Sequence, residues 1–208
     1  MILFDLDGTL IDSNGIWEQI DLDFLGRHGL APTEEYRHTV GHSIFPVAAE
    51  FTRSYYGLPM TAEEIMAEWL EDARGAYARV PLKEGAGEFV AQCAAQGLDM
   101  ALLTACEPTL CRIALERHGL APRFRDVVLV QEMGLEKRDP EVYALACARL
   151  GVAPADCVFY EDAPDNCAAA KTAGMTVVGV YDSFYEKYRL EMEQTCDRYI
   201  ERFTELLA

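Results

Sequence analysis

The sequence has few basic side chains and no run of them. Lys and Arg together number 18 against 35 Asp and Glu, which gives a formal net charge of -17. Such a surface repels phosphate backbones and anionic lipids, and only a local basic patch would overcome that repulsion. We therefore expect neither nucleic acid nor membranes among the partners. An anionic small molecule would have to be held locally, by a bound cation and a few placed positive side chains.

Long apolar runs and paired cysteine motifs are also lacking. The longest apolar runs are far shorter than a membrane-spanning helix requires, so no anchor is expected. The 7 cysteines are odd in number and none belongs to a C-x-x-C pair, which argues against a zinc site or a disulfide framework. With no signal-like segment at Met1, these absences predict a cytoplasmic protein.

What the sequence does contain is an alternation of short apolar runs with helical patterns. The apolar runs predict buried strands at Met1–Phe4, Leu98–Leu103, Val127–Val130, Val158–Tyr160 and Thr176–Tyr181. Helices are predicted at Gly87–Gln96, Glu107–His118, Pro140–Leu150 and Pro164–Ala173, and most are followed by a glycine that would cap them. A short strand at Asp197–Ile200 and a helix at Glu201–Leu207 are expected last. This alternation predicts an α/β fold with a doubly wound parallel sheet.

Residues 14–82 interrupt that alternation with helical patterns and no convincing strand. The predicted helices are Gly15–Arg27, Ser43–Tyr56 and Ala62–Arg79. The sequence therefore predicts two domains, a core of residues 1–13 and 83–208 and an inserted helical module of residues 14–82. Because the insertion leaves the sheet after its first strand, we expect it at the carboxyl edge, where ligands bind in open α/β sheets.

Two acidic residues end the first predicted strand. The two-residue period of an extended chain puts the side chains of Asp5 and Asp7 on one side. Two adjacent carboxylates are unfavourable unless a cation neutralises them or one proton is shared, and both outcomes suit chemistry. A calcium-binding EF-hand loop is excluded, because it needs Gly and Glu where this chain has Leu10 and Ile16.

The run Asp5-Leu6-Asp7-Gly8-Thr9 resembles the D-x-D-G-T signature of the haloacid dehalogenase superfamily. The resemblance implies a Rossmann-like core and a nucleophilic Asp5 that becomes an aspartyl phosphate. It also implies that Asp7 acts as general acid and base, protonating the leaving alcohol and then activating water. Asp7 disfavours a dehalogenase, because family members that cleave carbon–halogen bonds lack this second carboxylate.

Three further signatures follow in the family's order. Thr104, which ends the second strand, would hydrogen-bond a phosphoryl oxygen, and Ala105 is assigned to substrate binding where relatives often carry Asn or Ser. Lys137, in Lys137-Arg138-Asp139-Pro140, resembles the family lysine that neutralises the nucleophile and the transferring phosphoryl group. The pair Glu161-Asp162 resembles the acidic signature that binds magnesium, so the implied metal residues are Asp5, Asp7, Glu161 and Asp162.

The position of the insertion resembles that of the helical C1 cap of the family, which closes over the site and selects substrates. Candidate substrate contacts in it are Trp17 and His42, although a Trp in an amphipathic helix is more often core. The related β-phosphoglucomutase has a His and an Arg where this sequence has Trp17 and Ile44, which favours hydrolysis over mutase chemistry.

The resemblance therefore implies a Mg²⁺-dependent phosphatase acting on a small phosphorylated metabolite: a sugar phosphate, phosphoglycolate or a nucleotide monophosphate. The chain is expected to be a monomer or a weak homodimer. Two alternatives stay open. One is a phosphosugar mutase like β-phosphoglucomutase, and the other is a non-catalytic regulator that binds a phosphorylated ligand, which would not require Asp7.

Overall fold

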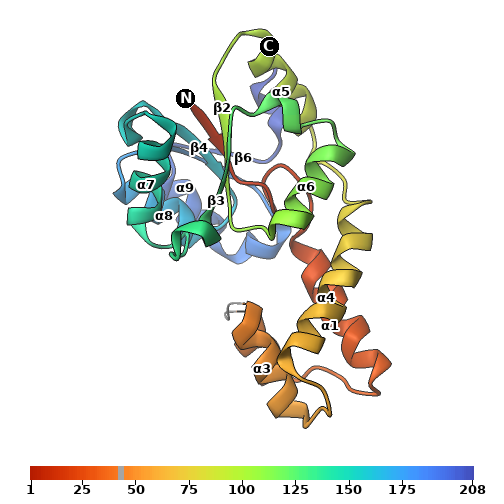
Figure 1. The fold of residues 1–208 in the computed structure, drawn as a ribbon. Coiled ribbons are helices and arrows are strands. Elements are labelled where there is room, and N and C mark those ends of the chain that lie inside the picture. Colours follow the sequence, from red (N-terminus) through yellow and green to blue (C-terminus); the bar gives the residue numbers. More distant parts are fainter. Residues whose placement is uncertain (42–44) are drawn as a thin grey trace. The chain divides into compact units, whose positions relative to one another are not determined.

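The computed structural model describes residues 1–41 and 45–208, and the chain divides into two compact units (Figure 1). The first unit comprises Met1–Asn14 and Arg79–Ala208, and the second comprises Gly15–Ala78. Asn14 is therefore the last residue of the first unit before the chain enters the second.

The first unit is built on a parallel sheet of six strands. In chain order these are β1 (Ile2–Phe4), β2 (Met100–Thr104), β3 (Val127–Leu129), β4 (Val158–Glu161), β5 (Thr176–Val180) and β6 (Arg198–Ile200). They lie in the order β3-β2-β1-β4-β5-β6, and each neighbouring pair is parallel. The doubly wound parallel sheet predicted from the sequence is confirmed. Because the strand order reverses between β1 and β4, the carboxyl ends of these two strands flank the point where such sheets bind ligands.

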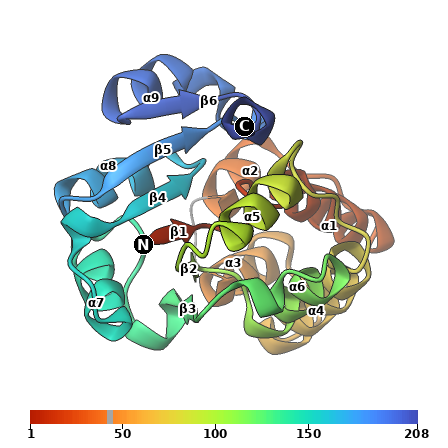
Figure 2. The same cartoon turned by 90° about the horizontal axis from the view of Figure 1, so that it is seen from above.

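Helices cover both faces of this sheet (Figure 2). The helices α7 (Pro140–Leu150), α8 (Pro164–Thr172) and α9 (Arg189–Thr195) pack on one face, over a buried cluster that includes Leu3 and Phe159. The helices α5 (Ala86–Ala95) and α6 (Pro108–Arg117) lie on the other, where Phe4 stacks on Tyr160 with 4.9 Å between ring centroids. Leu3 and Phe4 are both fully buried on opposite faces, as the two-residue period of a strand requires.

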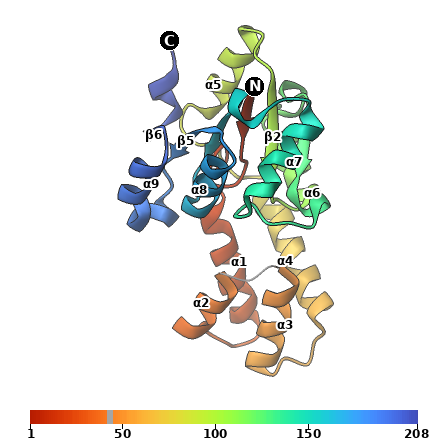
Figure 3. The same ribbon diagram turned by 90° about the vertical axis from the view of Figure 1, so that its left-hand side faces the viewer.

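In its described part, residues 15–41 and 45–78, the second unit is helical (Figure 3). The helices are α1 (Asn14–Arg27), α2 (Glu34–Gly41), α3 (Phe45–Tyr56) and α4 (Ala62–Tyr77). The first residue of α1, Asn14, still belongs to the first unit. The start of α4 is fixed by a capping box, in which Thr61 and Glu64 each accept a hydrogen bond from the other's backbone N–H. The core of this unit includes Phe24, Trp69 and Tyr77, all buried.

Several local predictions were wrong. The helix α2 was not predicted, although Thr33 accepts a hydrogen bond from the Tyr36 N–H and the buried Tyr36 ring anchors it. The helix α9 was also not predicted. The predicted helix Glu201–Leu207 is instead the short 3-10 helix η5 (Phe203–Leu206). Each of these elements is short, so its sequence pattern is too brief to predict it. Such short elements depend on tertiary contacts for their stability.

Four further 3-10 helices complete the first unit: η1 (Ala121–Arg123), η2 (Val130–Met133), η3 (Pro154–Asp156) and η4 (Ser183–Tyr188). Within the described ranges 1–41 and 45–208, none of the helices has the length and apolar character that crossing a bilayer would require.

Candidate active site

The carboxyl edge of the sheet gathers most of the polar residues singled out in the sequence. Asp5 directly follows β1, Thr104 ends β2, and Glu161 ends β4 with Asp162 next. The β1 and β4 strands are hydrogen-bonded neighbours, and the Asp5 N–H donates to the Tyr160 carbonyl oxygen at 2.9 Å. Parallel pairing therefore brings residues more than 150 positions apart in sequence to one place.

Lys137 joins this group from the segment before α7. Its ammonium nitrogen lies 2.7 Å from Oδ1 of Asp5 and 2.5 Å from Oε2 of Glu161. All three side chains are at least nine-tenths buried. Burial by itself would lower the pKa of Lys137, but the charges of Asp5 and Glu161 raise that pKa well above its ordinary value. The lysine is therefore a permanent cation between two carboxylates.

Asp162 lies beside Asp5 and Glu161, and its carboxylate accepts hydrogen bonds from neutral donors. The Thr9 hydroxyl donates to its Oδ1 at 2.8 Å, and the Asn14 side-chain amide donates to its Oδ2 at 2.8 Å. Burial raises the pKa of Asp162 well above its ordinary value, and the charges of Glu161 and Asp5 raise it further. The two hydrogen bonds act in the opposite direction by stabilising the ionised form.

The carboxyl group of Asp5 is itself poised between two protonation states. Its pKa is raised from 3.8 to about 7, chiefly by burial; the charges of Glu161 and Asp7 add to this rise, and Lys137 opposes it. Lys137 pairs with Asp5 and Glu161, and Asp162 adds a third buried carboxyl group, so the site holds more acidic than basic side chains and favours a bound cation.

Three of the four residues predicted to bind metal form a compact group. One carboxylate oxygen each from Asp5, Glu161 and Asp162 lies within 4.8 Å of the other two. Oε2 of Glu161 has no well-directed hydrogen bond within the described part of the chain, only its ion pair. Hard, buried carboxylate oxygens of this kind suit Mg²⁺, so the residues present fit the implied metal. The side chain of Asp7, the fourth predicted ligand, is not part of this group.

Asp7 lies two residues beyond Asp5 and is half-buried. Its Oδ1 accepts a hydrogen bond of 2.7 Å from the hydroxyl of Ser13, which is fully buried. Gly8, which follows Asp7, has φ of +78°, and a Cβ there would overlap the carboxylate of Asp162 and the amide of Asn14. Only glycine fits at this turn, which explains the Gly of the motif.

The predicted phosphate contacts are placed at the end of β2. Thr104 is fully buried, and its Oγ1 accepts a hydrogen bond of 3.0 Å from the Cys106 N–H. Ala105 is exposed, and its carbonyl oxygen accepts from the Gln131 amide at 2.9 Å. Thr104 thus ends the strand next to the one that Asp5 follows.

The predicted contacts in the helical unit have different outcomes. Trp17 is half-buried and packs edge-on against Phe45 and Tyr77, with ring centroids 5.6 and 6.4 Å apart. These aromatic contacts belong to the interior of that unit. His42 lies outside the described residues, as does Ile44, so neither is placed.

Three residues of the site were missed by the sequence analysis. Ser13 and Asn14 bind the carboxylates of Asp7 and Asp162, and the buried Tyr143 hydroxyl lies 2.8 Å from the Lys137 carbonyl oxygen and 3.0 Å from that of Asn166. Tyr143 thereby ties the lysine segment to α8. The nearness of Ser13 and Asn14 to the motif in sequence was the available signal, whereas nothing in sequence marks Tyr143.

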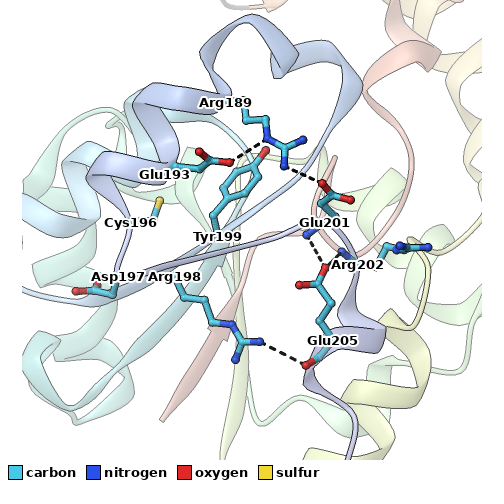
Figure 4. A pocket seen from close by; sticks show the side chains of 9 residues that line it. All are labelled: Arg189, Glu193, Cys196, Asp197, Arg198, Tyr199, Glu201, Arg202 and Glu205. Atoms are coloured by element: carbon cyan, nitrogen blue, oxygen red, sulfur yellow. Dashed lines mark hydrogen bonds and ion pairs between the residues drawn. The ribbon is translucent and has the colours of Figure 1, made fainter.

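A surface pocket lies elsewhere, along the edge strand β6 (Figure 4). Among its charged side chains, Arg189 forms ion pairs of 2.9 Å with Glu193 and 2.7 Å with Glu201. None of the predicted catalytic residues lines it. We therefore assign the chemistry to the carboxyl edge and not to this pocket.

Comparison with known proteins agrees with this geometry. The family model of haloacid dehalogenase-like hydrolases matches residues 1–174. Hexitol phosphatase B of Escherichia coli (strain K12) is 30% identical over 182 residues, which cover 86% of this chain and 82% of the relative. Hexitol phosphatase A of the same strain is 31% identical over 191 residues, with coverages of 86% and 81%.

Solved structures share the fold. CbbY from Rhodobacter sphaeroides, a mutant in complex with xylulose-(1,5)bisphosphate, superimposes with a TM-score of 0.81 at 22% identity and covers 99% of this chain and 95% of its own. β-Phosphoglucomutase from Clostridium difficile gives a TM-score of 0.76 at 15% identity, with coverages of 99% and 92%. At these identities the likeness concerns the fold alone.

Proposed function

The chain belongs to the haloacid dehalogenase-like hydrolases, and from this membership we propose that it is a Mg²⁺-dependent phosphatase. It hydrolyses a small phosphate monoester through an aspartyl phosphate on Asp5. The observation that carries the proposal is the buried group of Asp5, Glu161 and Asp162, whose carboxylate oxygens lie within 4.8 Å of one another beside Lys137. A purely structural role would not require three buried carboxylates with one lysine.

The first chemical step uses two residues at the end of β1. Oxygen of the ionised Asp5 carboxylate attacks phosphorus, and the bond from phosphorus to the substrate's alcohol oxygen breaks. Asp7 gives its proton to that leaving oxygen, so the alcohol departs neutral. The Ser13 hydroxyl, 2.7 Å from Asp7 Oδ1, orients the carboxyl group for this transfer.

The second step reverses the role of Asp7. Now ionised, it takes a proton from water, whose oxygen attacks phosphorus while the bond to Asp5 breaks, and inorganic phosphate leaves. Throughout, Lys137 and the Thr104 hydroxyl offer positive charge and a hydrogen bond to the phosphoryl oxygens.

Asp5, Asp162 and Glu161, with the carbonyl oxygen of Asp7, would hold Mg²⁺. The ion supplies charge that neutralises the phosphoryl oxygens and favours ionised Asp5. Thr9 and Asn14 keep Asp162 oriented for this role through their 2.8 Å hydrogen bonds.

We assign substrate choice to the helical unit, Gly15–Ala78, as the cap domain. Two relatives at 30% and 31% identity are named hexitol phosphatases, which supports a sugar or polyol phosphate as the first class to test. The relatives named as hexitol phosphatases favour hydrolysis over the mutase, and the presence of Asp7 argues against the non-catalytic regulator.

The test is phosphate release from hexitol, sugar and nucleotide monophosphates and phosphoglycolate, with Mg²⁺ or with EDTA. We expect Mg²⁺-dependent turnover that is lost in Asp5→Asn and Asp7→Asn and retained in Asp156→Asn, whose carboxylate is exposed. Equal turnover in wild type and Asp5→Asn would refute the mechanism. Transfer of phosphate to a sugar phosphate, with little free phosphate, would identify a mutase.

A further inference from the structure

Asn14 stands at a junction in the chain. It is the first residue of α1 and the last residue of the first unit before the helical unit begins. Its side chain turns back to Asp162, 148 positions away, and donates a hydrogen bond of 2.8 Å to Oδ2. The D-x-D-G-T motif does not include this residue, and it was not among the residues singled out in the sequence.

The partner of Asn14 is a buried carboxylate without a cation of its own. Asp162 is 2% exposed, and the ion pairs of Lys137 are made with Asp5 and Glu161. Within the described part of the chain, no ion pair involves Asp162. The donors that face its two oxygens are Thr9 on Oδ1 and Asn14 on Oδ2. A buried carboxyl group whose side-chain donors are neutral depends strongly on each of them.

The position of the Asn14 amide is tightly defined. The backbone of Gly8 packs so closely against this hydrogen-bonded pair that a Cβ there would overlap both Asp162 Oδ2 and Asn14 Nδ2. The amide and the carboxylate therefore occupy one small space beside the turn that follows Asp7. A carboxylate oxygen has two lone pairs, so the hydrogen bond from Asn14 leaves room for a cation on the same group.

We propose that Asn14 is a positioning residue for the metal site: its amide holds the Asp162 carboxyl group in one orientation, and so sets the affinity for Mg²⁺. The inference rests on the proposed function, because it takes Asp162 to be a metal ligand. Partners that orient a ligand in this way typically change metal affinity by about ten- to a hundredfold when removed. Asn14 touches neither substrate nor phosphorus in this account.

The experiment measures Mg²⁺ binding to the whole chain by calorimetry, without substrate. Asn14→Leu keeps the size of the side chain and removes its donor. We expect the Mg²⁺ dissociation constant to rise by roughly ten- to a hundredfold. Turnover at saturating Mg²⁺ should recover to within a few-fold of wild type. Gln19→Leu is the matched control, since it removes an exposed amide-to-carboxylate hydrogen bond to Asp23, and its dissociation constant should not change.

The unfolding temperature of the Asn14 variant without Mg²⁺ shows whether a lower Mg²⁺ affinity comes from the position of Asp162 or from a general loss of stability. If Asn14→Leu does not fold, Asn14→Ala is measured in its place. A folded Asn14 variant with a dissociation constant within twofold of wild type would overturn the inference. Wild type that binds Mg²⁺ but releases no phosphate would contradict the proposed function alone, whereas wild type that binds no Mg²⁺ would overturn both.

Discussion

The ammonium nitrogen of Lys137 lies 2.7 Å from Oδ1 of Asp5, with both side chains almost completely buried. Neither charge has bulk water to solvate it, so each depends on the other and on Glu161. A change in this pair should therefore affect both the electrostatics of the site and the stability of the core.

Lys137→Met should both destabilise and inactivate the protein. Removing one partner of a buried ion pair typically costs about 3–5 kcal/mol, because the other charge stays buried and unpaired. We expect that loss in urea unfolding of the metal-free protein, partly restored by Mg²⁺, and a loss of turnover of at least about a hundredfold. Arg138→Met is the control, since its exposed side chain forms an ion pair with the exposed Glu136, and a comparable loss there would contradict the proposed role of Lys137.

The pKa of Asp5 predicts how the stability of the metal-free protein depends on pH. Burial raises this pKa from 3.8 to about 7, so the folded state holds the proton more tightly than the unfolded chain does. Stability from this group is therefore fully present below about pH 4 and lost as pH rises to about 7. Between about pH 4 and pH 7, the unfolding temperature in EDTA should therefore fall less for Asp5→Asn than for wild type. Identical pH profiles would refute the shift.

Ser13→Ala should slow catalysis without weakening Mg²⁺ binding. Its hydroxyl donates to Asp7 and not to the metal group. Loss of one hydrogen bond of about 0.5–1.5 kcal/mol corresponds to a fall in kcat of roughly two- to tenfold. Ser54→Ala is the control, because that exposed hydroxyl donates to backbone carbonyl oxygens of its own helix, α3. A raised Mg²⁺ requirement in Ser13→Ala would show that the hydroxyl acts elsewhere.

Tyr143→Phe should loosen the segment that carries Lys137. The hydroxyl lies between the carbonyl oxygens of Lys137 and Asn166, and its removal takes away the hydrogen bond that it donates there. We expect a loss of about 1–3 kcal/mol in the free energy of unfolding, together with lower kcat. Tyr56→Phe, whose hydroxyl donates to the Ala31 carbonyl at an exposed position, should change stability far less. Equal losses in the two variants would argue against a specific role for Tyr143.

The sheet could be predicted because buried parallel strands consist of short apolar runs. The bounds of β1, β2, β4 and β5 were all predicted to within two residues. The residues that end those strands meet at one edge of the sheet, and the resemblance of their motifs to the family signatures is why Asp5, Thr104 and Asp162 could be named in advance. Nothing in sequence marks Tyr143, whose hydroxyl lies near the carbonyl oxygens of Lys137 and Asn166. The nearness of Asn14 to the motif did not reveal its hydrogen bond to Asp162, 148 positions away. The short helices α2 and α9 were missed for the related reason that tertiary packing determines them.

The central claim is that Asp5 carries the phosphoryl group. The most direct measurement uses Asp7→Asn with Mg²⁺ and p-nitrophenyl phosphate, a substrate whose leaving group needs no proton. The account predicts a burst of one nitrophenolate per chain, slow turnover afterwards, and a phosphoryl group found by mass spectrometry on the peptide that contains Asp5. A phosphoryl group on any other residue would contradict the mechanism. So would turnover by the wild type together with neither a burst nor a phosphoryl label in Asp7→Asn.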